Sequence, residues 1–164
     1  MEPDADTDPT DGRHETLDQR MDRNWNELLQ ELRVTQTGVQ ILTGFLLTLP
    51  FQQRFSELTS VQRATYLVLV LLAAVATALI VAPVSLHRIL FRRHLKVELV
   101  AAADRMARDG LVVLALVVAG TTFLVFDVVV GRAGALGAGG AVLALLTVFW
   151  LVLPLRLGRR PRST

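Results

Sequence analysis

Apolar residues in this chain are gathered into long blocks, whereas the helices of a soluble domain carry them in a stripe that polar residues interrupt. Four blocks stand out, at residues 34–51, 64–84, 111–130 and 135–155. A hydrocarbon core about 30 Å thick is crossed by roughly 20 apolar residues of α-helix, and each block approaches that length. The pattern therefore predicts an all-α fold, a four-helix transmembrane bundle embedded in a lipid bilayer.

The segment before the first block is amphipathic. Large apolar residues recur in it at spacings of three and four, which places them on one helical face: Leu17, Met21, Trp25, Leu28 and Leu32. No helix breaker separates this segment from the first block. We expect residues 17–33 to form a cytoplasmic helix that packs against another helix, from this chain or a neighbour. The alternative is a helix lying along the lipid headgroups, with Trp25 as its interfacial anchor.

Charge is distributed unevenly along the chain. Residues 1–33 contain ten acidic and four basic side chains, a net charge of −6, so the remainder must carry +8 to give the formal total of +2. Of the 17 Lys and Arg residues, 14 lie in the N-terminal segment, the loop between the second and third blocks, or the C-terminal tail. The positive-inside rule then places both termini and the middle loop in the cytoplasm. The excess of basic residues thus reflects membrane orientation and does not indicate nucleic-acid binding.

The ends of the chain differ from the membrane domain, residues 34–155. Residues 1–16 are rich in Asp, Pro and Thr and lack large apolar side chains, which predicts a disordered acidic tail. Residues 156–164 form a basic tail. Within the membrane domain we expect Pro83 to kink the second span, residues 131–140 to form a flexible turn, and Pro154 to end the fourth span.

Polar residues mark one face of the first span. Gln36, Gln40 and Thr43 are spaced at i, i+4 and i+7. An unpaired amide is costly in hydrocarbon, so this face should point into the bundle. Two interpretations stay open: the side chains hydrogen-bond between helices, or they line a polar path for an ion or solute.

Asp127 is the only acidic residue inside a predicted span. A carboxylate within the membrane is a functional-site candidate, because it can carry a proton or bind a cation. The alternative is a carboxylate near the outer interface, hydrated or paired with Arg132 or Arg63. The depth of Asp127 decides between the two.

Small residues recur every four positions on the second and fourth spans. The positions are Ala74, Ala78 and Ala82, and the pairs Gly137/Ala141 and Gly140/Ala144. Small residues let two helix backbones approach closely. They predict close helix crossings and are compatible with a homo-oligomer, for which a dimer is the simplest form.

The basic middle loop and the indole of the N-terminal segment are candidates for docking. They comprise Arg88, Arg92, Arg93, Lys96 and Trp25. The basic residues would bind anionic lipid headgroups or the acidic N-terminal helix, unless they serve topology alone. His87 and His94 lack carboxylates at metal-binding spacing, and the chain contains no cysteine. We find no catalytic motif, and we expect neither a cofactor nor a metal.

Three strings resemble a known family: WNELLQELRVTQTGVQILTGFLLTLPFQQRF from Trp25, VAPVSLHR from Val81 and VFDVVVG from Val125. They are similar to a family of small four-span actinobacterial membrane proteins of unknown function, whose members are sometimes named sodium:proton antiporter by automated naming. The resemblance implies a four-span architecture in a bacterial cytoplasmic membrane. It also places Asp127 and the polar face of the first span within the family's motifs.

Three functional hypotheses follow, of which membrane enzymology ranks last because the sequence has no candidate catalytic constellation. The first is a non-enzymatic scaffold or accessory protein of the membrane that docks partners through the acidic helix and the basic loop. The second is a small cation (sodium):proton antiporter that uses Asp127 with Gln36, Gln40 and Thr43. The scaffold hypothesis predicts that Asp127→Asn is tolerated and that loss of residues 17–33 is not, whereas the antiporter hypothesis predicts the reverse.

Overall fold

The computed structural model describes residues 16–90 and 96–158, and this part of the chain is helical throughout, apart from short connections. Its elements are α1 (Leu17–Thr48), η1 (Leu49–Phe51), η2 (Gln53–Glu57), α2 (Ser60–Leu90), α3 (Lys96–Val129), α4 (Arg132–Thr147), the π-helical η4 (Val148–Val152) and α5 (Leu153–Gly158). The predicted all-α fold is confirmed. We call α4, η4 and α5 together the C-terminal helix.

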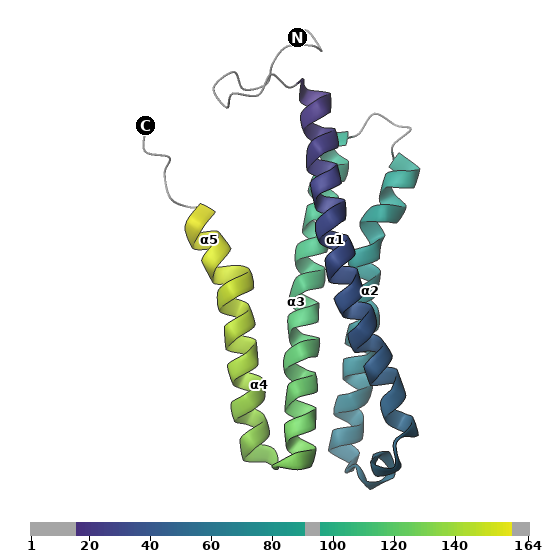
Figure 1. The fold of residues 1–164 in the computed structure, drawn as a ribbon, viewed down its shortest axis with the longest axis vertical. Helices are drawn as coiled ribbons and strands as arrows, with labels where there is room; N and C mark the ends of the chain where they lie inside the picture. Colours follow the sequence, from purple (N-terminus) through teal and green to yellow (C-terminus); the bar gives the residue numbers. More distant parts are fainter. Residues whose placement is uncertain (1–15, 91–95, 159–164) are drawn as a thin grey trace.

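The long helices alternate in direction (Figure 1). The start of α1, the end of α2, the start of α3 and the end of α5 lie at one end of the molecule, which we call the terminal end. The α1–α2 and α3–α4 connections lie at the other, which we call the turn end. The predicted acidic tail, residues 1–16, lies outside the described residues except for Thr16.

Three helices in the described part are long and apolar enough to cross a membrane: Ser60–Ser85, Ala101–Val129 and Arg132–Arg156. They coincide with the second, third and fourth predicted spans, and they indicate a membrane protein. The second half of α1 is not among them, because Gln and Thr residues interrupt its apolar sequence. A fourth crossing and the direction of the bundle in the membrane therefore stay predictions.

Helix α1 joins the amphipathic segment and the first predicted span without a break. Thr16 begins it with a capping box: its Oγ1 accepts from the Gln19 backbone N–H at 3.3 Å, and its own N–H donates to Gln19 Oε1 at 3.0 Å. Pro50 closes the helix by forcing the chain into the short turn η1. Residues 17–33 are thus the first half of one long helix, and its buried face packs on α3 rather than along lipid headgroups.

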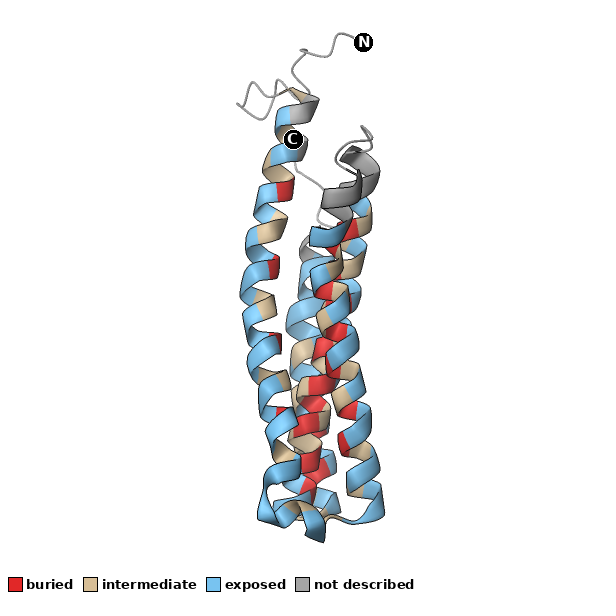
Figure 2. Cartoon of the chain, turned by 90° about the vertical axis from the view of Figure 1, so that its right-hand side faces the viewer, coloured by how far each residue is buried: buried red, intermediate tan, exposed pale blue. Residues whose placement is uncertain are grey.

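The buried positions of α1 follow a seven-residue period (Figure 2). They are Trp25, Leu32, Val39 and Leu46. Trp25 packs on Ala103, which corrects the prediction that it anchors the helix among headgroups or docks a partner. Leu46 packs between Ala73 of α2 and Val117 of α3. A period of 3.5 residues is the pattern of helices that pack as in a coiled coil.

The close contact between α2 and α3 uses small residues, but not the ones expected. Ala73 and Ala76 are buried, whereas Ala74 and Ala78 are exposed. The α2–α3 contact within the chain therefore does not use Ala74 and Ala78, Ala82 is half-buried, and a crossing of this small-residue face with a second copy stays a prediction. Tyr66, Leu69 and Ile80 complete the face that is buried, and these large side chains set the rotation of α2. Helix α2 continues through Pro83 to Leu90.

The C-terminal helix begins earlier than expected. The predicted flexible turn at residues 131–140 is wrong, since α4 starts at Arg132 and the chain reverses over Val130 and Gly131. Gly131 has a φ of 97°, a conformation that glycine adopts without steric cost. Proline lacks an N–H and crowds the carbonyl one turn earlier. The wider π-helical turn η4 precedes Pro154 and accommodates it, so the helix reaches Gly158 instead of ending at the proline.

The crossing of α4 with α3 is also displaced from the predicted residues. Gly137, Gly140, Ala141 and Ala144 are exposed, and the buried residues of α4 are Ala135 and Gly139. A Cβ atom at Gly139 would lie 2.9 Å from Phe123 Cβ and 3.3 Å from the Ala119 carbonyl oxygen. Gly139 is therefore the residue that lets the two backbones approach.

Candidate functional site

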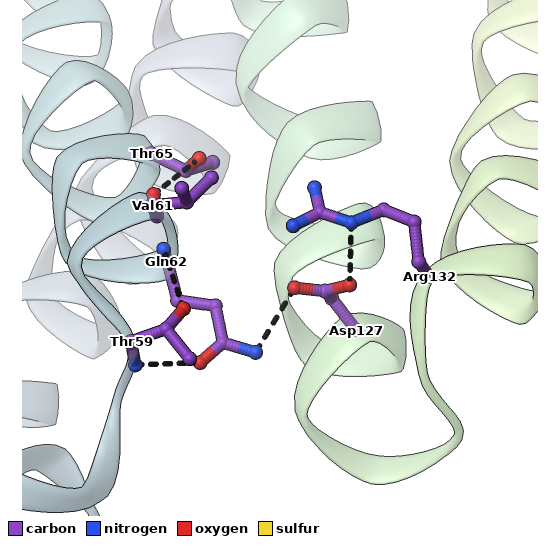
Figure 3. Close-up of polar contacts among 6 residues, drawn as sticks. All are labelled: Thr59, Val61, Gln62, Thr65, Asp127 and Arg132. Carbon is purple, nitrogen blue, oxygen red and sulfur yellow. Dashed lines mark hydrogen bonds and ion pairs between the residues drawn. The ribbon is translucent and has the colours of Figure 1, made fainter.

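Asp127 lies in the last turn of α3, at the turn end of the molecule, and its side chain is 5% exposed. Both carboxylate oxygens have partners (Figure 3). Arg132 Nε lies 3.2 Å from Oδ1, and Gln62 Nε2 donates to Oδ2 at 2.9 Å. We call these three residues the Asp127 clasp.

The turn after α3 brings Arg132 to Asp127. The N–H groups of Val130 and Gly131 both donate to the Phe126 carbonyl, at 2.8 and 3.1 Å, and the left-handed Gly131 then starts α4. Arg132 is the first residue of that helix, so its side chain reaches back toward the end of α3. Its guanidinium carbon lies 5.5 Å from the centre of the Phe123 ring, a cation–π contact that holds it further.

Gln62 is fixed by the N-terminal capping of α2. Its N–H donates to Thr59 Oγ1 at 3.3 Å, and its Oε1 accepts from the Thr59 N–H at 3.0 Å. This is a capping box, in which the glutamine closes the first turn of the helix. Because Oε1 is held by the backbone, the amide nitrogen is directed at Asp127. The clasp thereby joins the start of α2, the end of α3 and the start of α4.

The clasp holds a buried carboxylate together with a positive charge from Arg132 and a hydrogen-bond donor from Gln62. A carboxylate withdrawn from water needs an opposite charge and hydrogen-bond donors, and Asp127 has both. Of the two arginines expected as partners, Arg132 makes the pair, while Arg63 is exposed and has no contact with Asp127. The described residues contain no group of three His, Asp or Glu side chains that would hold a metal ion.

The polar face of α1 is divided between the interior and the surface. Gln36 and Thr43 are half-buried at the positions that alternate with the buried residues of α1. Gln40 is exposed, so the prediction that it points into the bundle is wrong. The reason is the 3.5-residue period, which places positions 36, 39 and 43 on the inner seam and position 40 beside it.

The predicted pathway residues are not connected in the described structure. Its hydrogen bonds do not link Asp127 with Gln36, Gln40 or Thr43, and Thr43 Oγ1 is buried without a partner. The carboxylate and the polar face of α1 are thus separate features.

Gln62 and Tyr66 are the polar residues that the sequence analysis missed. The Tyr66 hydroxyl donates to the Leu46 carbonyl at 3.1 Å. The Tyr66 ring packs edge-to-face against the Phe55 ring, with 5.1 Å between the ring centroids. The helical acceptor Leu46 would normally receive the N–H of residue 50, which is a proline and has none. The pattern Thr59-x-x-Gln62 is a capping-box signal and would have drawn attention to Gln62.

The remaining docking candidates cannot be assigned contacts. Arg92 and Arg93 lie outside the described residues, and the side chains of Arg88 and Lys96 lie outside the described part as well. His87 and His94 fall in the same region.

Comparison with known proteins places the chain in one family. Neither the curated proteins nor the solved structures compared with it give a match. A family model described as a family of unknown function (DUF6328) matches residues 14–154, which run from α1 to the start of α5 and include the Asp127 clasp. Because this match covers well over half of the sequence, the chain belongs to the family of unknown function DUF6328.

Proposed function

We propose that this protein is a non-enzymatic scaffold or accessory protein of the membrane. The observation that carries the proposal is the first half of α1. One face is buried against α3 through Trp25 and Leu32, while the opposite face exposes polar and acidic side chains. These are Asn26, Glu27, Gln30 and Glu31. A helix held rigidly on one side and charged on the other presents a fixed surface to a partner.

The proposed topology has four crossings, with both termini and the α2–α3 junction in the cytoplasm. The distribution of 14 of 17 basic residues supports this direction. The second half of α1 supplies the remaining crossing, and its packing beside the apolar spans of α2 and α3 as far as Leu46 supports that assignment. The sequence resemblance supports a bacterial cytoplasmic membrane.

The second candidate function is a small cation:proton antiporter that uses Asp127, Gln36, Gln40 and Thr43. Burial of the Asp127 carboxylate at the end of an apolar span favours it. The engagement of both carboxylate oxygens and the separation of Asp127 from the polar face of α1 weigh against it. We therefore place it second.

Proton flux in proteoliposomes tests the two candidates directly. The purified full chain is reconstituted, and flux is recorded under a Na⁺ gradient and then a K⁺ gradient, with Asp127→Asn as the comparison. The scaffold proposal expects flux equal to that of protein-free vesicles for both proteins. Flux that is present in the wild type and lost in Asp127→Asn would establish the antiporter and reject the scaffold.

Site-specific photocrosslinking in native membranes tests the docking surface. A crosslinking residue at Gln30 is expected to give one defined adduct, and Glu27→Lys with Glu31→Lys is expected to remove it. Gln53, exposed at the turn end, is the matched control position. Adducts that are identical from both positions, or that survive the charge reversal, would contradict docking through α1.

A further inference from the structure

An apolar groove runs between α3 and the C-terminal helix, in the half of the pair nearer the terminal end. Its volume is about 420 Å³. Leu111 and Leu116 of α3 form one wall, and Leu146, Trp150 and Leu151 of the C-terminal helix form the other. Figure 1 shows the cause: the C-terminal helix touches α3 near the turn end and diverges from it toward the terminal end.

The divergence follows from the side chains along the crossing. Ala135 and Gly139 allow close approach near the turn end. Beyond them the inner residues are large, and the π-helical segment Val148–Val152 widens the helix by adding a residue to one turn. The two walls therefore diverge beyond Gly139, and leucine and tryptophan side chains line the space between them.

The mouth of the groove at the terminal end is basic. Arg108 lines it, and its side chain is 69% exposed. Its interactions in the described structure are both with Asp104, whose carboxylate accepts from one terminal nitrogen. Arg156, also exposed, follows Leu155 of the groove lining.

We propose that this groove binds an anionic phospholipid, with one acyl chain along its apolar walls and the phosphate group at Arg108 and Arg156. The two walls belong to candidate membrane spans, so an acyl chain matches their chemistry. Basic side chains at the cytoplasmic ends of such grooves attract anionic headgroups. Trp150 on the wall is the amphipathic residue typical of the interfacial region.

A helix from a second copy fits this groove less well. Helices that pack in membranes do so through small residues that admit a neighbouring backbone. The groove walls are mostly leucine and tryptophan, with Ala115 and Thr147 as their small residues, and the exposed Gly137 and Gly140 of the C-terminal helix are absent from the lining. A flexible acyl chain fills an irregular space between large side chains better than a second helix does.

Native mass spectrometry of the full chain tests the proposal. The protein is purified in detergent and mixed with phosphatidylglycerol or phosphatidylcholine, which differ in headgroup charge, and bound lipid is counted. We expect preferential retention of phosphatidylglycerol. Leu146→Trp, which fills the groove, should remove most bound lipid of both kinds, whereas Leu145→Trp, exposed and outside the lining, should remove none.

Charge variants separate the headgroup from the chain. Arg108→Gln should lower the preference for phosphatidylglycerol roughly fivefold, which corresponds to about 1 kcal/mol for one basic residue. Binding of phosphatidylcholine should not change. Asp104→Asn, which removes the negative charge paired with the Arg108 guanidinium, should raise the preference, and Arg105→Gln, outside the groove lining, should leave it unchanged.

Three outcomes would overturn the proposal. The first is equal retention of the two lipids by the wild type. The second is unchanged lipid binding in a folded Leu146→Trp protein. The third is a shift from dimer to monomer in that variant without loss of lipid, which would assign the groove to a second copy. If Leu146→Trp does not fold, the exposed Arg108→Gln variant decides alone.

Discussion

The two sides of α3 are packed in different ways. Toward α1 and α2, buried residues follow one another from Ala103 to Leu124. Toward the C-terminal helix, the contact rests on Ala135, Gly139 and the Asp127 clasp. Of the most apolar window in each candidate span, 28% is buried in α2 and 33% in α3, but 6% in the C-terminal helix. The molecule is therefore a three-helix core with a fourth helix attached at one end.

The difference shows what holds helices together when their surroundings are apolar. Lipid chains are as apolar as leucine, so an exposed leucine on a membrane helix gains little by moving inside. Stability then depends on close packing and on polar contacts. The core has buried side chains along its length, whereas the buried residues of the C-terminal helix, Ala135 and Gly139, and the Asp127 clasp lie in its half nearer the turn end.

Leu46→Ala should have the largest effect, because it opens a cavity in the three-helix core. Leu46 is fully buried between Ala73 and Val117. Substitutions of this type lower the free energy of unfolding by about 2–5 kcal/mol. Chemical denaturation in detergent, followed by circular dichroism, measures the change. Leu145→Ala, exposed on the C-terminal helix, is the matched control, and an equal loss in both would disprove the contrast between the two sides of α3.

Arg132→Met should have the next largest effect, because it leaves the Asp127 carboxylate buried without its cation. Breaking a buried ion pair lowers the free energy of unfolding by about 3–5 kcal/mol. Because the Arg132 side chain is half-exposed, we expect a loss at or below the lower limit of that range. The same denaturation experiment measures the loss of stability. The contacts of the C-terminal helix should be weakened most. Adding Asp127→Asn removes the buried charge and should restore much of the stability. A double variant as unstable as the sum of both single variants would show that the pair is not coupled.

Gly139→Leu should displace the C-terminal helix at its crossing. The new side chain would meet Phe123 and the Ala119 carbonyl, and overpacking of this kind costs typically about 1–3 kcal/mol. Spin labels on the exposed residues Val112 and Ala144 would report a longer distance between α3 and α4. Gly137→Leu is the control, since a Cβ at Gly137 meets nothing within 4 Å, and its distance should equal that of the wild type.

The order of the helices could be predicted from the sequence, but the ends of the C-terminal helix and the rotation of the helices could not. The apolar blocks located α2, α3 and the C-terminal helix, whereas the inner faces were missed by about one position at Ala73 and Gly139. A helix that is apolar on all sides has no polar face to identify its outside. On α1, where polar and apolar residues alternate, the buried positions Trp25 and Leu32 were among those expected.

In the Asp127 clasp, the partner that is near in sequence could be predicted, whereas the partner that is distant in sequence could not. Arg132 is five residues from Asp127, across a single turn, and was among the expected partners. Gln62 is separated from Asp127 by 65 positions, and its amide reaches the carboxylate through the packing of α2 on α3. Spacing within one sequence carries no information on such a pair. The capping motif marks Gln62 as a helix start, but not as a ligand of the carboxylate.

Tyr66→Phe should have the smallest effect of the four, and it tests whether the core and the attached helix respond separately. The variant removes the hydroxyl that donates to the Leu46 carbonyl, which keeps the Leu49 N–H as its other donor, while the ring keeps its contact with Phe55. Loss of one such hydrogen bond costs about 1 kcal/mol. Denaturation should show that decrease, and the spin-label distance between Val112 and Ala144 should stay that of the wild type. A change in this distance would mean that the α1–α2 contact also positions the C-terminal helix, and the molecule would then be one cooperative bundle rather than a core with an attached helix.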